Sequence, residues 1–376
     1  MKFVFYTHSL VSDWNHGNAH FLRGVMRELV SRGHRAIALE PEDGWSRTNL
    51  LREQGESAIR SFTERFPELS WESYGPAFEH EAALSDADVV FVHEWTDPAL
   101  VARIGRARRE GGPFTLVFHD THHRAVSAKP QIAELQLQDY DLILAFGETL
   151  RQRYLSTGWG RQVVTWHEAA DTRLFRPLPQ EEKEADLIWI GNWGDDERTA
   201  EIKEYLIEPA AQLGLAGTVR GVRYPAEALE ALQRAGLSYG GWIANHDVPG
   251  AFARHRATVH IPRQPYVDAL PGIPTIRVFE ALACGIPLVS APWNDVEELF
   301  RPGMDFLYAG TGAEMAARIE RVLNDPELAA SLAESGLETI RSRHTCSHRV
   351  DELLDALSRH GSTKVRRELA LREAAE

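Results

Sequence analysis

Short apolar runs alternate with amphipathic segments along most of this chain, a pattern typical of proteins built on parallel β-sheets. Runs that are continuous in Val, Ile, Leu and Phe predict strands buried on both faces. The first half predicts strands at 3–6, 35–39, 89–93, 114–118 and 142–146, and helices at 18–31, 50–66, 97–110 and 148–156. Helices would cover both faces of such a sheet, and ligands would bind beyond the carboxyl ends of its strands.

The alternation breaks after residue 168 and then starts again. Residues 169–185 hold a Leu-Pro pair followed by a charged run, which is typical of a linker. The second half predicts strands at 187–190, 219–221, 257–261, 286–290 and 304–308, and helices at 197–206, 226–235, 274–284, 312–324, 326–341 and 348–358.

We therefore predict an α/β protein of two facing Rossmann-like, doubly wound domains with an interdomain cleft. The N-terminal domain is expected at 1–168 and the C-terminal domain at 186–345, joined by the linker 169–185. The helices within 346–376 are expected to pack back on the N-terminal domain. The charged tail 364–376 suits either a helix or a frayed end.

The stretch from Gly272 to Ser290 offers the clearest candidate site. Pro274 suits a first helical position, where its missing N–H costs nothing, and Gly285 suits the helix end. The helix start would present free backbone N–H groups and a positive dipole end, which together suit a diphosphate. Glu280, one turn further in and near Arg277, could accept hydrogen bonds from both hydroxyls of a ribose. An ordinary buried helix with one solvated glutamate fits the same residues.

The turn after the first expected strand includes His16, Gly17 and Asn18 at the start of a helix. It lacks the G-x-G-x-x-G fingerprint of dinucleotide-binding proteins. A glycine beside a helix start still lets the backbone approach a ligand closely. A plain turn explains these residues equally well.

Three histidines and an aspartate lie within residues 119–123, at the end of an expected strand. Functional groups of an open α/β sheet collect at such a place. His119 and His123 would share a face only if a helix followed at once, and no H-E-x-x-H pattern is present, so we expect no metal ion. His119, beside Asp120, suits a hydrogen-bond donor or a general acid or base. A histidine satisfied by loop carbonyls is the alternative.

A tight turn from Gly191 through Asn192 and Trp193 follows the first strand of the second half. Two glycines frame this turn before a helix, which suits the cradling of an anion. Arg198 and Lys203 are the cations within reach. The acids at 195–196 complement the start of a helix dipole and are preferred in that role over a metal-binding pair.

Trp242 and Ile243 lie in a glycine-rich loop that precedes an amphipathic helix. An aromatic face, a backbone turn and an amide side chain are what a nucleobase needs for stacking and for hydrogen bonds at its edge. A glycine-rich loop with a packed tryptophan is the alternative.

Composition excludes several classes of protein. The formal charge of −14 argues against sequence-independent binding of nucleic acid, which needs a basic surface. Two cysteines cannot form a disulfide framework or a four-cysteine zinc site, and they fit a reducing cytoplasm. No run of eighteen apolar residues predicts a membrane span.

Taken together, these segments resemble a GT-B glycosyltransferase, most closely the CgeB-like group that is related to the retaining group 1 (family 4) glycosyltransferases. Phe279–Val289 is the most specific match. Asp171–Pro177 resembles the interdomain segment of that superfamily, and residues 241–262 resemble its base-binding loop, helix and strand. The turn Ser31–Arg35 is a weaker match. The resemblance spans most of the chain and implies a GT-B fold, with the N-terminal domain on the acceptor side and the C-terminal domain binding the nucleotide sugar.

The resemblance also implies a role for each matching residue. Glu280 would bind the ribose, the backbone of 274–276 with Arg198 would hold the diphosphate, and Ile243 would hold the base. His119 would lie near the donor sugar. The residues expected to bind the donor are His16, Gly17, Asn18, Gly191, Asn192, Trp193, Arg198, Trp242, Ile243, Arg263, Ile273, Pro274, Thr275, Ile276, Arg277 and Glu280, and those expected to be catalytic are His119, Asp120, Arg198 and Glu280.

One position departs from the pattern of the related group. That group usually carries an acid eight residues before the ribose-binding glutamate, where this chain has Gly272. Asp268 is close but out of register. The contact that this acid makes to the donor sugar therefore has no counterpart at this position.

The expected activity is transfer of a hexose or related sugar from a UDP-, GDP- or dTDP-linked donor to a hydroxyl group. The acceptor would be a carbohydrate, a lipid-linked molecule or a small molecule. We expect no cofactor, no metal ion and retention of configuration, with the leaving phosphate helping to deprotonate the acceptor. The alternatives are a nucleotide-sugar epimerase or hydrolase on the same fold, and a non-catalytic nucleotide- or sugar-binding partner.

Overall fold

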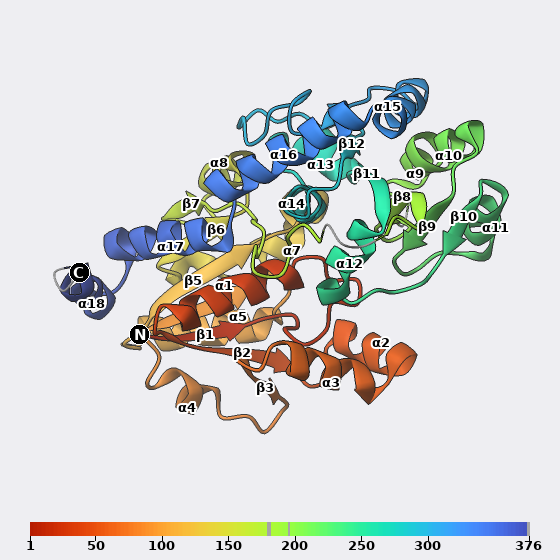
Figure 1. Cartoon of the computed structure of the whole chain (residues 1–376). Helices are drawn as coiled ribbons and strands as arrows, with labels where there is room; N and C mark the ends of the chain where they lie inside the picture. The colour runs from red at the N-terminus through yellow and green to blue at the C-terminus, as the bar shows by residue number, and fades with distance from the viewer. Residues whose placement is uncertain (179–181, 195, 374–376) are drawn as a thin grey trace. The chain divides into compact units, whose positions relative to one another are not determined.

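The structure is a computed structural model that describes residues 1–178, 182–194 and 196–373 (Figure 1). The chain divides into two compact units. Unit 1 comprises residues 1–168 and 346–376, and unit 2 comprises residues 169–345. Part of the expected linker (179–181), the acid at 195 and the last three residues of the tail lie outside the described residues.

Unit 1 is built on a parallel sheet. Within the described residues its strands are β1 (Lys2–Tyr6), β2 (Arg35–Pro41), β3 (Ser70–Tyr74), β4 (Val89–His93), β5 (Thr115–Asp120), β6 (Leu142–Ala145) and β7 (Val163–Thr165), in the order β3-β2-β1-β4-β5-β6-β7. β4 and β5 are buried along their whole length, as expected for central strands that are covered on both faces. Their carboxyl ends lie side by side, because His93 of β4 is in register with His119 of β5.

Helices connect the strands of unit 1, and the end of the chain adds two more. They are α1 (Ala19–Ser31), α2 (Trp45–Gln54), α3 (Glu56–Arg65), α4 (His80–Leu84), α5 (Pro98–Arg109), α6 (Arg124–Ser127), α7 (Lys129–Ala133), η1 (Leu137–Asp139), α8 (Glu148–Thr157), α17 (Cys346–His360) and α18 (Thr363–Glu373). α17 packs on α1, and Figure 1 shows α17 (blue) beside α1 (red). Nη2 of Arg32 donates there to the carbonyl (3.1 Å) and the hydroxyl (2.8 Å) of Ser347.

Unit 2 repeats the same arrangement. Within the described residues its parallel strands are β8 (Ala185–Ile190), β9 (Gly217–Arg220), β10 (Leu237–Tyr239), β11 (His255–His260), β12 (Leu288–Ser290) and β13 (Leu307–Tyr308), in the order β10-β9-β8-β11-β12-β13. In each unit, strands one to six along the chain are ordered 3-2-1-4-5-6. This is the order of doubly wound folds, whose ligands bind where the order reverses, at the carboxyl ends of the strands.

The helices of unit 2 bury its sheet. They are α9 (Thr199–Ile202), η2 (Lys203–Ile207), α10 (Glu208–Leu213), α11 (Ala226–Arg234), η3 (Asn245–Asp247), α12 (Val248–Ala253), α13 (Gln264–Ala269), α14 (Ile276–Ala283), α15 (Gly312–Asn324) and α16 (Pro326–Arg343). Leu187, Val219 and Val259 of the sheet form one core with Met315 and Ile319 of α15. No helix among the described residues is long and apolar enough to cross a membrane.

Three predicted elements were wrong in detail. The helix expected at 50–66 is two helices, because Gly55 takes a φ of +66° between α2 and α3. The helix expected at 197–206 is interrupted by the π-helical turn η2. Pro274 does not open a helix, since α14 begins at Ile276 with Thr275 as its N-cap. The short strands β3, β7 and β10 were not predicted, because each has polar or half-exposed positions instead of a continuous apolar run.

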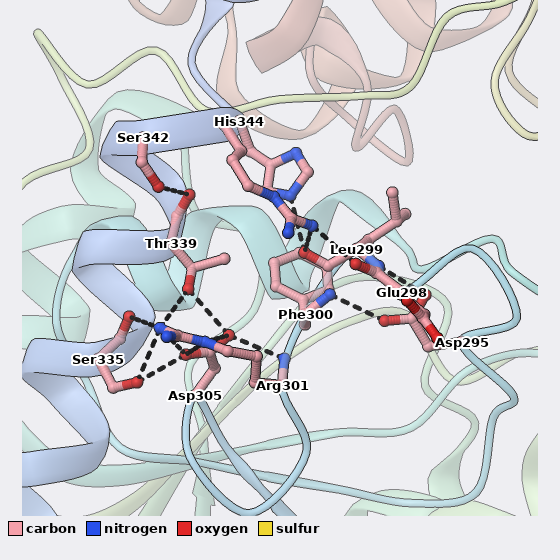
Figure 2. Close-up of polar contacts among 11 residues, drawn as sticks. Asp295, Glu298, Leu299, Phe300, Arg301, Asp305, Ser335, Thr339, Ser342 and His344 are labelled. Atoms are coloured by element: carbon pink, nitrogen blue, oxygen red, sulfur yellow. Dashed lines mark hydrogen bonds and ion pairs between the residues drawn. The ribbon is translucent and has the colours of Figure 1, made fainter.

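The loop between β12 and β13 is fixed to α16, as Figure 2 shows. Asp305 is fully buried and pairs with Nη2 of Arg301 at 2.9 Å. Its carboxylate also accepts hydrogen bonds from the hydroxyls of Ser335 (2.7 Å) and Thr339 (2.9 Å) on α16. A buried carboxylate is tolerated only when it is paired and hydrogen-bonded. This network therefore holds a loop that packs against the turn at Gly272, just before α14.

Candidate functional site

The amino end of α14 lies at the carboxyl edge of the sheet in unit 2, and its N-cap side chain does not cap it. Oγ1 of Thr275 is instead hydrogen-bonded to Nε2 of His260 at 3.1 Å. Nδ1 of the same imidazole bonds to the hydroxyl of Ser290 at 2.9 Å. Burial and the nearby Arg198 lower the pKa of His260 to about 3, so the ring is neutral. The imidazole thus joins the ends of β11 and β12 to the start of the helix. Because the Thr275 hydroxyl bonds to His260, it does not cap the backbone N–H groups of α14.

Glu280 lies one turn into α14 and has no exposed surface. Its Oε2 forms an ion pair with Nη1 of Arg277, whose side chain is 15% exposed. The predicted ribose-binding carboxylate is therefore covered by an arginine in this structure. A diol that reaches Glu280 has to share or displace that guanidinium.

Arg198 is a buried cation without a carboxylate partner among the described residues. Its Nη1 and Nη2 donate to the carbonyls of Ile261 (3.2 Å) and Asn192 (2.7 Å), and its Nε has no partner in that part of the chain. The guanidinium lies 5.2 Å from the ring centre of Trp189. Burial, and then the neighbouring guanidinium of Arg263, lower the pKa of Arg198 to about 9.

Two further arginines surround this cation. Arg263, just after β11, donates from Nη1 to the carbonyl of Gly194 (3.0 Å) and to Oε2 of Glu197 (2.6 Å). Arg263 and Arg277 both lower the pKa of Arg198, which places three guanidinium groups within electrostatic reach of one another. Only two of them are paired with a carboxylate among the described residues. A buried charge without a counter-ion is costly, so this arginine cluster (Arg198, Arg263 and Arg277) is suited to an anion.

The turn beside Arg198 is tight enough to require glycine. A Cβ on Gly194 would lie 2.4 Å from Cγ of Arg198, and its φ of +107° disfavours other residues. Asn192 accepts a hydrogen bond at Oδ1 from the backbone N–H of Val222 (3.0 Å), so its side chain braces the turn. Trp193 is buried in the core against Tyr224. Its side chain therefore supports the turn, and its contact with the donor stays a prediction.

The remaining predicted binding residues of unit 2 divide into backbone and side-chain positions. Ile273 and Ile276 are buried in the core, so only their backbone can meet a ligand. Trp242 and Ile243 are half-buried in the loop after β10. Gly272 takes a φ of +89°, and a Cβ there would lie 2.8 Å from Oε1 of Glu297. The carboxylate of Glu297 thus fills the space next to the position where the related group carries an acid.

At the carboxyl edge of unit 1, strands β1, β4 and β5 bring four imidazoles together. We call His8, His16, His93 and His119, with the carboxylate of Glu94, the histidine cluster. The ring centres of His8 and His16 are 5.1 Å apart, those of His16 and His93 are 6.2 Å apart, and those of His93 and His119 are 5.6 Å apart. Among the described residues, no group of His, Cys, Asp and Glu side chains is arranged to hold a metal ion.

Glu94 is the charged centre of the histidine cluster. It is 1% exposed, and its Oε2 lies 3.0 Å from Nδ1 of His93. Oε1 accepts a hydrogen bond from the hydroxyl of Thr121 at 3.1 Å. Burial alone would raise the pKa of Glu94, but His93 and Arg124 hold it well below its ordinary value. The carboxylate is therefore ionised at neutral pH.

The other predicted residues of unit 1 have mainly supporting contacts. Asp120 is fully buried and accepts hydrogen bonds from the hydroxyl of Tyr154 (2.7 Å) and the backbone N–H of His122 (3.0 Å). Burial and the charge of Glu94 raise its pKa to about 7. Nδ2 of Asn18 donates to the carbonyl of Thr121 at 3.3 Å, which joins the Gly17 turn to the loop after β5.

Sequence analysis singled out neither Glu94 nor its neighbours His93 and Trp95. A signal was present, because polar residues and a tryptophan follow directly on the buried strand 89–93, at the sheet edge where ligands bind. Arg124 was also missed. Its guanidinium lies 4.1 Å from the ring centre of Trp95.

Comparison with known proteins gives a family match over part of the chain. A family model described as glycosyl transferase-like matches residues 198–355, which is less than half of the chain. This segment contains the arginine cluster and α14. No curated protein matches.

Many solved structures share the fold. HepE from Anabaena, in complex with UDP and glucose, aligns with a TM-score of 0.68 at 16% identity over 95% of this chain and 99% of that chain. An alpha-glucosyltransferase in complex with UDP and a 13-mer DNA aligns with a TM-score of 0.68 at 13% identity over 95% and 99%. Sucrose-phosphate synthase from Thermosynechococcus elongatus aligns with a TM-score of 0.64 at 13% identity over 94% and 96%. The prediction of the fold class is confirmed: the chain has the α/β fold of GT-B structures, with two Rossmann-like domains.

Proposed function

We propose that this protein is a glycosyltransferase that moves a sugar from a nucleoside diphosphate sugar to a hydroxyl group. The observation that carries the proposal is the buried guanidinium of Arg198, which lies near Arg263 and Arg277 and has no carboxylate partner among the described residues. A diphosphate supplies the missing negative charge. The uncapped amino end of α14 adds backbone N–H donors and a favourable dipole.

The family match and the fold support the same proposal. The matched segment contains every member of the arginine cluster. HepE and the alpha-glucosyltransferase were both solved with UDP, so UDP is the first nucleotide to test, before GDP and dTDP.

The arginine cluster is suited to the chemistry of sugar transfer. Departure of a nucleoside diphosphate builds negative charge on its phosphate oxygens, and buried guanidinium and N–H groups stabilise that charge without reorganising. A divalent cation is then unnecessary. No side chain in the described part of unit 2 stands out as a covalent nucleophile. We therefore propose metal-independent transfer of a hexose or related sugar with retention, the leaving phosphate taking the proton of the acceptor hydroxyl.

Calorimetric titration with UDP tests the nucleotide site. Arg277→Gln should weaken binding about tenfold, because a hydrogen bond to a charged group contributes about 1.5–3 kcal/mol. Arg256→Gln is the matched control, since Arg256 pairs with Asp186 (2.9 Å) at the opposite, amino-terminal edge of the same sheet. The control should bind UDP like the wild type. Absence of binding to UDP, GDP and dTDP, or equal effects of the two variants, would contradict the proposal.

Assays with a UDP-sugar separate the possible reactions. Incubation with the donor alone yields slow hydrolysis for a transferase and an epimeric donor for an epimerase. Addition of acceptor panels should give a product that forms equally well in excess chelator. Loss of product formation in chelator, restored by a divalent cation, would refute metal independence.

A further inference from the structure

The imidazole of His260, at the carboxyl end of β11, is buried between two hydroxyl groups. His260 is 1% exposed and is in register with Ser290, the last residue of β12. Its Nδ1 bonds to the hydroxyl of Ser290, and its Nε2 bonds to the hydroxyl of Thr275, the N-cap of α14. Each of these bonds can run in either direction. Their direction fixes what the Thr275 hydroxyl can do at the start of the helix.

The hydroxyl of Ser290 determines which ring nitrogen carries the proton. It donates its only proton to the carbonyl of Ala291 at 2.9 Å. Toward His260 it can then only accept, so Nδ1 of the ring is the protonated nitrogen. The ring is neutral, because burial and the charge of Arg198 lower its pKa to about 3. Nε2 of His260 is therefore an acceptor without a proton.

The hydroxyl of Thr275 is held by this acceptor. Because Nε2 of His260 has no proton, the hydroxyl donates to it across the 3.1 Å contact. Thr275 has the extended backbone of a helix N-cap, with a φ of −80° and a ψ of 158°, yet no described N–H group of α14 donates to its side chain. A threonine at this position ordinarily accepts from the second or third N–H of the helix. The imidazole thus favours a rotamer of Thr275 that leaves α14 uncapped.

The first backbone N–H groups of α14 are open. The N–H of Val278 donates to the carbonyl of Thr275 at 3.1 Å. The N–H groups of Ile276 and Arg277 have no hydrogen-bond partner in the described part of the chain. Two adjacent N–H groups at the positive end of a helix dipole suit a phosphate oxygen.

His260 also lies within electrostatic reach of the arginine cluster. The positive charge of Arg198 contributes to the lowered pKa of the imidazole. Arg198 is buried, and its Nε has no partner among the described residues. The open N–H groups of α14 and this guanidinium are thus both close to His260. One anion with several oxygens suits both.

We propose that His260 is a positioning residue, whose imidazole accepts a hydrogen bond from the Thr275 hydroxyl and so reserves the first N–H groups of α14 for the diphosphate of the donor. This inference rests on the proposed function, because it takes the bound anion to be that diphosphate. Without the imidazole, the Thr275 hydroxyl caps the helix and competes with the phosphate. His260 itself touches no substrate and acts through Thr275.

Calorimetric titration with UDP tests this role through a double-mutant cycle. His260→Phe keeps a ring of similar size and removes its nitrogens. It should weaken UDP binding about fivefold, a factor that matches the usual strength of a threonine cap. His260→Phe combined with Thr275→Val, which has no hydroxyl to cap the helix, should bind UDP at least threefold more tightly than His260→Phe alone. Thr275→Val alone completes the cycle. A histidine that only braces the fold gives no recovery in the double variant, and that result would overturn the proposal.

Two further variants sharpen the test. His260→Gln retains an acceptor oxygen for the Thr275 hydroxyl, so it should bind UDP more tightly than His260→Phe. His255→Phe is the matched control, because the buried His255 on the same strand also bonds to a threonine hydroxyl, Oγ1 of Thr218, at 3.0 Å. His255 lies at the amino end of β11, so this variant should bind UDP like the wild type. Equal losses in folded His255→Phe and His260→Phe would contradict the role assigned to His260.

The conformation of Thr275 can be determined without any nucleotide. In a crystal structure of His260→Phe, Oγ1 of Thr275 should lie within about 3.2 Å of the backbone nitrogen of Arg277 or Val278. In a crystal structure of the wild type it should bond to His260. A hydroxyl that stays away from the helix in the variant would exclude the proposal, whether or not UDP binds. Failure of UDP to bind the wild type would instead refute the proposed function, and the two crystal structures would then show by themselves whether His260 controls the cap.

Discussion

The carboxyl edges of the two sheets share a strand order but differ in their charge. In unit 2 that edge gathers three guanidinium groups with two paired carboxylates. In unit 1 it gathers four imidazoles around a single ionised carboxylate. The backbone arrangement fixes where a ligand can bind, and the side chains that end each strand decide its charge.

Of the changes that test this comparison, acid pH should have the largest effect. It should lower the free energy of unfolding, because the carboxyl edges of both sheets contain buried neutral imidazoles. The folded-state pKa is about 4 for His8 and about 3 for His119 and His260, against about 6.5 in the unfolded chain. Below about pH 6.5 only the unfolded chain takes up these protons. Each ring then lowers the free energy of unfolding by about 1.4 kcal/mol per pH unit, down to its folded-state pKa.

Asp120 acts in the opposite direction. Its pKa is raised to about 7, so it adds to the free energy of unfolding as the pH falls from 7 toward 4. This gain offsets the loss from about one of the three imidazoles. Urea denaturation at pH 7 and pH 5 should therefore show a net loss of a few kcal/mol. His119→Gln should make the loss smaller. A free energy of unfolding that is independent of pH over this range would show that the rings are not held neutral.

Arg198→Gln should have the next largest effect and should be confined to unit 2. It removes a buried cation that already holds the carbonyls of Ile261 and Asn192. We expect the dissociation constant of UDP to rise about 100-fold, from the loss of about two charge-assisted hydrogen bonds. Arg198→Lys keeps the charge but not the planar fork of the guanidinium. Its dissociation constant for UDP should lie between those of Arg198→Gln and the wild type.

Arg256→Gln is the control for Arg198→Gln, because Arg256 pairs with Asp186 at the opposite edge of the same sheet. The control should bind UDP like the wild type. An equal loss of UDP binding in both folded variants would contradict the role assigned to Arg198.

Gly272→Ala should have a smaller, structural effect. The φ of +89° at this position disfavours a side chain, and the new Cβ would press on the carboxylate of Glu297 at 2.8 Å. We expect a loss of about 1–2 kcal/mol in the free energy of unfolding, together with weaker UDP binding through the turn before α14. Combining it with Glu297→Ala should recover part of the loss. A purely additive double variant would mean that the two residues do not interact.

Salt should have the smallest effect and should act on the edge of unit 2. Raising the ionic strength from 0.1 to 1 M shortens the Debye length from about 10 Å to about 3 Å. UDP binding to the arginine cluster should weaken several-fold, as measured by calorimetry. An affinity for UDP that does not change with salt would contradict the role assigned to these three guanidinium groups.

The sequence predicted the parts of this molecule that depend on local patterns. Continuous apolar runs located the central strands of both sheets, and Gly285 ends α14 with a φ of +64° as expected. Short strands such as β10 escaped prediction, because Ser238 and Tyr239 are exposed. The assignment of individual binding residues stays a prediction.

What the sequence could not supply was the pairing of distant side chains. His16, His93 and His119 are far apart along the chain, and only the register of β1, β4 and β5 brings their rings together. The ion pair of Arg277 with Glu280, by contrast, joins residues three apart on one helix, which is a spacing that the sequence shows. Trp193 lies in a turn whose residues predict ligand binding. Its indole packs against Tyr224, a residue 31 positions further along the chain, which the sequence does not show.

The last helices of the chain affect the order in which its two units are completed. Lys364 of α18 pairs with Asp88, and the backbone N–H of Ser362 donates to the hydroxyl of Thr115 (2.8 Å), so the end of the chain secures strands made long before it. Unit 2 is continuous in sequence, and domains generally fold as units during synthesis. The strands of unit 1 are all made before α17, so the flank of α1 stays uncovered until α17 emerges.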